Sequence, residues 1–151
     1  MAKILLPSGV IPDLAAQYVN HLKQKIDMFE ISCGWNTAAI IRPDITKLKL
    51  INHTYLLDFK QGYTLNYAEE IKRKNPDAII TSVGGFRSAR MMEEALKNKK
   101  VDMISTVRPF IREPNLVKKI KKNPNTVSAC ISCNHCLIFN EADPKGLRCD
   151  Y

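Results

Sequence analysis

Three short apolar segments that alternate with amphipathic stretches constrain the fold of this chain most strongly. In each of them an Asp introduces a run rich in Ile, Met or Val; the segments are KIDMFEIS (25–32), NPDAIITSVGG (75–85) and KVDMISTVRP (100–109). Apolar runs of this length, bounded by polar or turn residues, are typical of strands that are buried on both faces of a parallel sheet. We therefore expect three parallel strands.

Three stretches with helical periodicity lie before or between these segments: DLAAQYVNHLKQK (13–25), NYAEEIKRK (66–74) and SARMMEEALKNK (88–99). Asp13 and Ser88 are candidate N-caps, because a short polar side chain can accept hydrogen bonds from the amides of a first helical turn. The residues expected to face the core are Leu14, Ala15, Tyr18, Val19, Leu22, Tyr67, Ala68, Ile71, Met91, Met92, Ala95 and Leu96. A last helix is expected near NLVKKIKK (115–122). This alternation predicts right-handed βαβ units and an α/β fold.

The number of strands limits the architecture. A closed (β/α)₈ barrel needs eight strands and about 250 residues, whereas this chain has 151 residues and three predicted strands. Asp27, Asp77 and Asp102, which introduce the strands, are 50 and 25 residues apart, so the first interval holds an additional segment, 34–63. That segment is either part of a ligand-binding rim or a surface excursion. The sheet is open, or the chain is part of a larger barrel.

Composition and charge exclude several classes of protein. A chain with 45% hydrophobic and 25% charged residues is expected to form one soluble globular domain. The opening MAKILLPSGV does not resemble a signal peptide, and no run approaches the roughly 18 apolar residues of a membrane span, so we expect a cytoplasmic location. The net charge is +8, but the densest basic run, VKKIKKNPN (117–125), follows a helical pattern and contains no aromatic residue. A solvated helix end is therefore favoured over a nucleic-acid site.

Two adjacent strand ends carry groups that suit a phosphate. Gly84 and Gly85 lie where the second predicted strand turns into its helix, and Arg108 ends the third predicted strand. Exposed amides of a glycine pair and a guanidinium group both bind phosphate oxygens. The alternatives are a simple tight turn for the glycines and a surface ion pair, for instance with Glu113, for Arg108. The combination favours a phosphate site.

Four cysteines fall within the last 22 residues: Cys130, Cys133, Cys136 and Cys149. In a reducing cytosol, clustered cysteines are more often metal ligands or redox groups than disulfides. The C-x₂-C-x₂-C array favours an iron–sulfur cluster, but a zinc site in which His135 replaces one thiolate and an unliganded set both remain open. Cys33 lies about a hundred residues earlier and is interpreted as a small buried hydrophobic residue.

The sequence from Ile79 to Ile120, with its Gly-Gly strand end and its RPFIREPNLV segment, followed by CISCNHC (130–136), resembles a known family. It is similar to the C-terminal part of the catalytic barrel in the iron–sulfur branch of the Old Yellow Enzyme and 2,4-dienoyl-CoA reductase family of NAD(P)H:flavin oxidoreductases. FEISCG (29–34) resembles the preceding strand of that barrel. The resemblance implies the C-terminal portion of a (β/α)₈ TIM barrel, about three βα units in residues 1–122, followed by a cysteine-rich metal-binding tail in residues 123–151.

That family binds FMN and reduces activated carbon–carbon double bonds with hydride from NAD(P)H. The resemblance implies that the FMN phosphate is held by Gly84, Gly85, Val107 and Arg108. It further implies that the four clustered cysteines hold one [4Fe–4S] cluster. Catalytic residues are expected on earlier strands of the barrel, and none is expected in this chain.

The partners implied by the resemblance are a complementary N-terminal half of the barrel and a small enone or enoyl substrate, with neither nucleic acid nor a membrane. The chain is then a truncated or split C-terminal fragment of the enzyme. The alternative is a small, non-catalytic electron-carrying protein that binds an iron–sulfur cluster or zinc and derives from that enzyme.

Overall fold

The computed structural model describes residues 10–32, 61–132, 136 and 146–149. Within this part, a parallel sheet of three strands runs in the order β1 (Met28–Ile31), β2 (Ile79–Val83) and β3 (Met103–Ser105). Each strand lies inside one of the three segments predicted from the sequence. The α/β fold with parallel strands is therefore confirmed.

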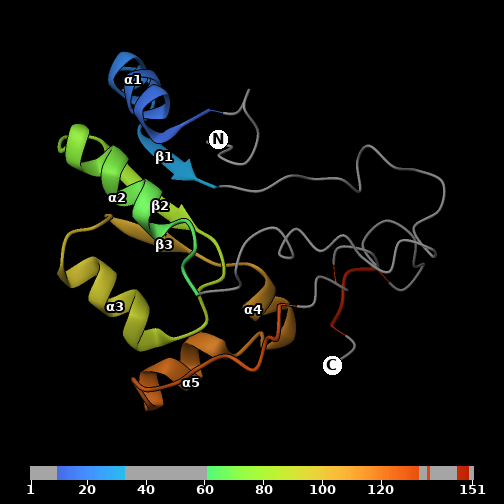
Figure 1. Cartoon of the computed structure of the whole chain (residues 1–151). Helices are drawn as coiled ribbons and strands as arrows, with labels where there is room; N and C mark the ends of the chain where they lie inside the picture. Colours follow the sequence, from blue (N-terminus) through green and yellow to red (C-terminus); the bar gives the residue numbers. More distant parts are fainter. Residues whose placement is uncertain (1–9, 33–60, 133–135, 137–145, 150–151) are drawn as a thin grey trace.

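Helices precede and follow the strands in the predicted alternation. Their bounds are α1 (Pro12–Leu22), α2 (Leu65–Lys74), α3 (Ala89–Lys97), α4 (Arg108–Arg112) and α5 (Leu116–Lys122). Figure 1 shows α1, α2 and α3 along one side of the sheet. The short helix α4 directly follows β3 and was not predicted, because its five residues are too few to show a helical period.

The two faces of the sheet differ. Ile31 and Ile80 are buried in the core beneath the helices. Side chains alternate between the faces along a strand, so Met28, Ile79 and Met103 lie on the opposite face, where they are 45%, 46% and 49% exposed. Within the described residues, the sheet therefore has one face covered by helices and one face on which three apolar side chains are half open to solvent, beside the polar residues Glu30 and Thr81.

Two predicted core positions are wrong. Tyr18 is 52% exposed and Leu96 is 40% exposed, whereas Ala16, which was not predicted, is only 4% exposed. The helix α1 packs against α2, and the amide nitrogen of the Asn75 side chain donates to the Ala16 carbonyl at 3.1 Å. Alanine allows this close approach between the helices, so the buried face of α1 is rotated away from Tyr18.

One of the two predicted helix caps is correct. Ser88 caps α3, and its hydroxyl oxygen accepts a hydrogen bond from the Met91 amide at 3.3 Å. Asp13 does not cap α1, because Pro12 already occupies the first turn and Ile11 becomes the capping residue. Asp13 instead pairs with Lys74 of α2, which holds the pKa of the Asp13 carboxyl below its ordinary value.

Two of the three aspartates that introduce the strands, Asp77 and Asp102, have structural roles. The Asp102 carboxylate accepts a hydrogen bond from the Ile80 amide at 2.8 Å and pairs with the Lys72 ammonium group at 2.8 Å. Asp77 pairs with Lys23 at 2.8 Å. These contacts tie the beginnings of the strands to the helices that cover them.

Some predictions fall on residues that the structure does not describe. Among them are Cys33 and the part of the inserted segment from 34 to 60. In the described part of the chain, no helix is both long and apolar enough to cross a membrane.

Candidate phosphate site and cysteine segment

The loops that follow β2 and β3 lie at the same edge of the sheet. The pairing of these parallel strands places Val83 opposite Ser105. The glycine pair and the Val107–Arg108 pair therefore follow neighbouring strands at their carboxyl ends. The hydroxyl group of Thr106 also donates to the Phe86 carbonyl at 3.2 Å, which connects the two loops directly.

The glycine pair has a geometry that larger residues do not fit. A Cβ atom on Gly84 would lie 2.7 Å from Cγ2 of Thr64, closer than real Cβ contacts. Gly85 has a φ angle of 69°, in the left-handed region that favours glycine. Thr64 is fixed in turn, because its hydroxyl oxygen lies 2.7 Å from that of Ser82 and both residues are fully buried. Thr64, at the start of α2, thus packs against the loop that holds the glycine pair.

Gln61 supports the same loop and was missed by the sequence analysis. Its side-chain oxygen accepts hydrogen bonds from the amides of Arg87 at 3.1 Å and Ser88 at 2.7 Å. Because the amides of Arg87 and Ser88 are already bound by Gln61, an anion at this loop would be bound by the glycine pair and not by the beginning of α3. No local pattern could reveal this contact, because it joins residues 26 and 27 positions apart.

Cationic groups accompany the glycine pair. Arg108 begins α4, immediately after Val107, whose side chain is 62% exposed. Glu113, the ion-pair partner considered for Arg108, is bound by Lys119 at 2.6 Å. On the β2 side, the Nε atom of Arg87 is a buried donor without a hydrogen-bond partner among the described residues. Backbone amides and guanidinium groups both bind phosphate oxygens, and the residues that carry them follow neighbouring strands at one edge of the sheet.

Three of the four clustered cysteines lie in the described part. Cys130 and Cys136 are buried, Cys149 is partly buried, and none of the three forms a disulfide. A guanidinium nitrogen of Arg112 donates to the sulfur of Cys149 at 3.5 Å.

Cys133 and His135 lie outside the described residues. Among the residues that are described, no three His, Cys, Asp or Glu side chains gather closely enough to hold a metal ion. The described cysteines therefore do not by themselves form the cage of a cluster, and the four-cysteine site remains a prediction.

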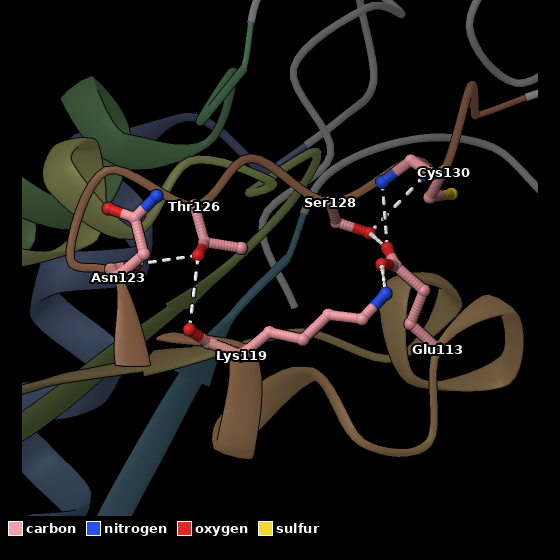
Figure 2. Close-up of polar contacts among 7 residues, drawn as sticks. Glu113, Lys119, Asn123, Thr126, Ser128 and Cys130 are labelled. Carbon is pink, nitrogen blue, oxygen red and sulfur yellow. Dashed lines mark hydrogen bonds and ion pairs between the residues drawn. The ribbon is translucent and has the colours of Figure 1, made fainter. Parts of the chain in front are cut away.

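A buried carboxylate fixes the chain just before Cys130. Figure 2 shows Glu113 between the ammonium group of Lys119, at 2.6 Å, and the segment at Ser128, whose hydroxyl group donates to the carboxylate. The amide of Ala129 donates to the same carboxylate at 2.7 Å. The hydrogen bonds from Lys119 and Ser128 lower the pKa of Glu113 from 4.5 to about 2, although burial acts in the opposite direction.

Residues 19–126 match the model of a protein family described as the NADH:flavin oxidoreductase / NADH oxidase family. The chain is 27% identical to an NADPH dehydrogenase of Bacillus velezensis over 104 residues, which make up 69% of this chain and 26% of that protein. It is 28% identical to an NADPH dehydrogenase of Bacillus subtilis, also over 104 residues and with the same coverage. It is 34% identical over 70 residues to the NADH-dependent flavin oxidoreductase iccE of Talaromyces variabilis, covering 46% of this chain and 17% of that protein.

A solved structure of a 2-naphthoyl-CoA reductase in complex with 2-naphthoyl-CoA is similar in fold. The TM-score is 0.64 at 22% sequence identity, and the match covers 89% of this chain and 19% of that chain. At this identity the similarity shows a shared fold. The chain spans about a quarter or less of the length of the curated relatives it matches.

Proposed function

This chain belongs to the NADH:flavin oxidoreductase / NADH oxidase family, and we propose that it supplies the phosphate-binding end of the barrel of an FMN-dependent NAD(P)H oxidoreductase. The observation that carries this proposal is the register of β2 and β3, in which Val83 pairs with Ser105. This register brings the glycine pair and Arg108, which lie more than twenty positions apart in the sequence, to one edge of the sheet.

In this proposal, the phosphate group is bound by Gly84, Gly85, Val107 and Arg108. The glycines let backbone amides approach the phosphate oxygens, and the guanidinium group of Arg108 adds charge-assisted hydrogen bonds. When bound, FMN supplies the hydride-transfer chemistry between NAD(P)H and the substrate. The role of this chain is to bind and orient the cofactor, and the catalytic residues lie on other strands.

The apolar face of the sheet supports the idea that more strands complete the barrel. Met28, Ile79 and Met103 are half exposed on that face, which would become the packed interior of a (β/α)₈ barrel. We propose that the remaining strands come from further sequence, either on the same polypeptide or on a second one that forms the complementary barrel half. The substrate of the complete enzyme is proposed to be a small enone or enoyl compound whose carbon–carbon double bond is reduced.

A metal site in the cysteine segment is a further part of the proposal. We propose that Cys130, Cys133, Cys136 and Cys149 hold one [4Fe–4S] cluster. Their spacing supports this assignment, as do the burial of Cys130 and Cys136 and the hydrogen bond that Cys149 accepts from Arg112. Zinc bound with the help of His135 is the competing assignment.

The test is a fluorescence titration with FMN. The full chain should bind FMN weakly when expressed alone and tightly when co-expressed with a polypeptide that carries the rest of the barrel. In the assembled protein, Arg108→Ala should weaken FMN binding about 10- to 100-fold, since hydrogen bonds to a charged group contribute about 1.5–3 kcal/mol.

Arg90→Ala is the matched control, because it removes the same charge from an exposed ion pair with Glu94 on α3. It should leave FMN binding unchanged. Tight flavin binding by the full chain alone, or equal losses in the two variants, would contradict the proposal.

A further inference from the structure

The segment that follows α5 returns to the loop of the glycine pair. The amide of Ala89 donates to the Thr126 carbonyl at 3.0 Å, and the amide of Ser128 donates to the Arg87 carbonyl at 2.9 Å. Ser88 and Val127 form an antiparallel bridge between these two hydrogen bonds. Residues 126–130, termed the clasp here, therefore pair like a short strand with the residues directly after Gly84 and Gly85.

The opposite side of the clasp is held from the β3 side of the sheet edge. Glu113 directly follows α4, the helix that Arg108 begins, and its residue surface is only 8% exposed. Its carboxylate accepts hydrogen bonds from the Ala129 amide at 2.7 Å and from the Ser128 hydroxyl group (Figure 2). The Ser128 oxygen also accepts a hydrogen bond from the Cys130 amide at 3.2 Å.

The clasp thus joins the two loops of the candidate phosphate site. One guanidinium nitrogen of Arg87, in the loop after β2, donates to the Cys130 carbonyl at 3.0 Å. Glu113, which directly follows α4, binds the neighbouring Ser128 and Ala129. A buried carboxylate that accepts several hydrogen bonds is costly to disturb, because its donors lose their partner together with it.

We propose that Glu113 is a positioning residue, which latches the clasp across the carboxyl ends of β2 and β3 and so fixes the spacing of the two loops that would bind the FMN phosphate. The inference rests on the proposed function only in assigning those loops to FMN. The hydrogen bonds between Glu113 and the clasp do not depend on any cofactor or metal. If Glu113 contributed only to overall stability, its replacement would lower the free energy of unfolding without selectively opening the clasp.

The first test measures opening of the clasp in the full chain after removal of bound metal with a chelator, so that Cys130 is a free thiol in every variant, and at a protein concentration too low for self-association. In Glu113→Ala, alkylation of Cys130 by iodoacetamide, followed by peptide mass spectrometry, should be about 10- to 100-fold faster than in the unchanged protein. Amide exchange should accelerate by a similar factor at Ser128 and Ala129. Glu113→Gln keeps the size and one acceptor oxygen, so its effect should be intermediate.

Two control variants separate a local from a global effect. Ile71→Val removes one methyl group from a fully buried residue of α2, a helix that contributes no residue to the clasp, and lowers overall stability. Glu93→Gln removes a carboxylate that is 61% exposed and pairs with Lys97. Neither should accelerate Cys130 alkylation by more than about 2-fold, given that opening of the clasp does not require global unfolding. If Cys130 alkylation were accelerated equally in Ile71→Val and Glu113→Ala, Glu113 would not hold the clasp.

The second test compares FMN with riboflavin, which lacks the phosphate, in the protein assembled with the rest of the barrel. Glu113→Ala should reduce the preference for FMN at least about 5-fold, while Ile71→Val should leave it unchanged, because only the former releases the phosphate loops. A preference that survives in Glu113→Ala would show that the clasp does not position these loops. If the unchanged assembled protein showed no preference for FMN, the proposed function would fail, and the alkylation result would still decide whether Glu113 holds the clasp.

Discussion

At the scale of single residues, the hydrogen bonds around Glu113 strongly lower the pKa of its carboxyl group. Its pKa falls from 4.5 to about 2, chiefly through the hydrogen bond from Lys119 and then that from Ser128. A carboxylate whose pKa is lower in the folded than in the unfolded state stabilises the fold fully above the unfolded pKa. This contribution is lost as the pH falls from about 4.5 towards about 2.

We therefore predict an acid-sensitive stability that depends on Glu113. Between pH 5 and pH 2.5, the unfolding free energy from urea titration should drop by about 1–2 kcal/mol more in the unchanged chain than in Glu113→Gln, allowing for screening at the half-exposed Lys119. Glu93→Gln, with its exposed ion pair, should behave like the unchanged chain. Parallel pH profiles for the unchanged chain and Glu113→Gln would refute this role.

Gly84 provides a steric prediction at the same scale. Gly84→Ala would place a Cβ atom 2.7 Å from Cγ2 and 2.9 Å from Oγ1 of Thr64. Since overpacking costs about 1–3 kcal/mol, thermal unfolding should show a destabilisation of that size. Thr64→Ser removes Cγ2 but keeps the hydroxyl group that contacts Ser82, so it should recover part of the loss in the double variant. A neutral Gly84→Ala would mean that the backbone is not packed so closely on Thr64.

Some of these residues could be identified from the sequence and others could not. Ser88 could be predicted as a helix cap from the sequence, because its hydrogen bond with Met91 is local. Gln61 and Glu113 act on residues 15 to 27 positions away, and no periodic pattern encodes such contacts. Asp13 was misjudged because Pro12 competes for the start of the helix.

At the scale of elements, the strands were predictable because an Asp followed by an apolar run signals a buried parallel strand. The positions of α1, α2, α3 and α5 also followed from their amphipathic periods. Which face of α1 is buried could not be predicted from its period. Ala15 and Ala16 fit a buried or an exposed position equally well, and only the packing of α2 decides between them. The clasp was not predicted either, because its pairing with the start of α3 depends on tertiary structure.

The cysteine segment carries its own prediction. Anaerobic reconstitution should give about four iron and four sulfide ions per chain, as expected for one [4Fe–4S] cluster. Serine in place of Cys130, Cys133, Cys136 or Cys149 should lower the occupancy, whereas Cys33→Ser should not change it. Bound zinc without acid-labile sulfide or broad visible absorption would reject the cluster, and His135 would then be the ligand to replace.

At the scale of the whole molecule, the described sheet has two unequal faces and unpaired edges. Met28, Ile79 and Met103 lie on the face that the helices leave open. Exposed apolar surface and unpaired strand edges both favour association. When the chain is expressed alone, light scattering should show self-association or aggregation, and co-expression with a polypeptide that carries the proposed remaining strands should suppress it. A sharp monomer peak for the chain alone would contradict this view of the open face.

We propose that this chain binds the phosphate end of FMN, and the ratio of the affinities for FMN and riboflavin tests this proposal most directly. In the chain assembled with the rest of its barrel, FMN should bind much more tightly than riboflavin. Arg108→Ala should reduce that ratio about 10- to 100-fold by weakening FMN binding alone, since only FMN carries the phosphate that the guanidinium group contacts. A ratio that Arg108→Ala leaves unchanged, whether both affinities fall equally or neither falls, would contradict the account.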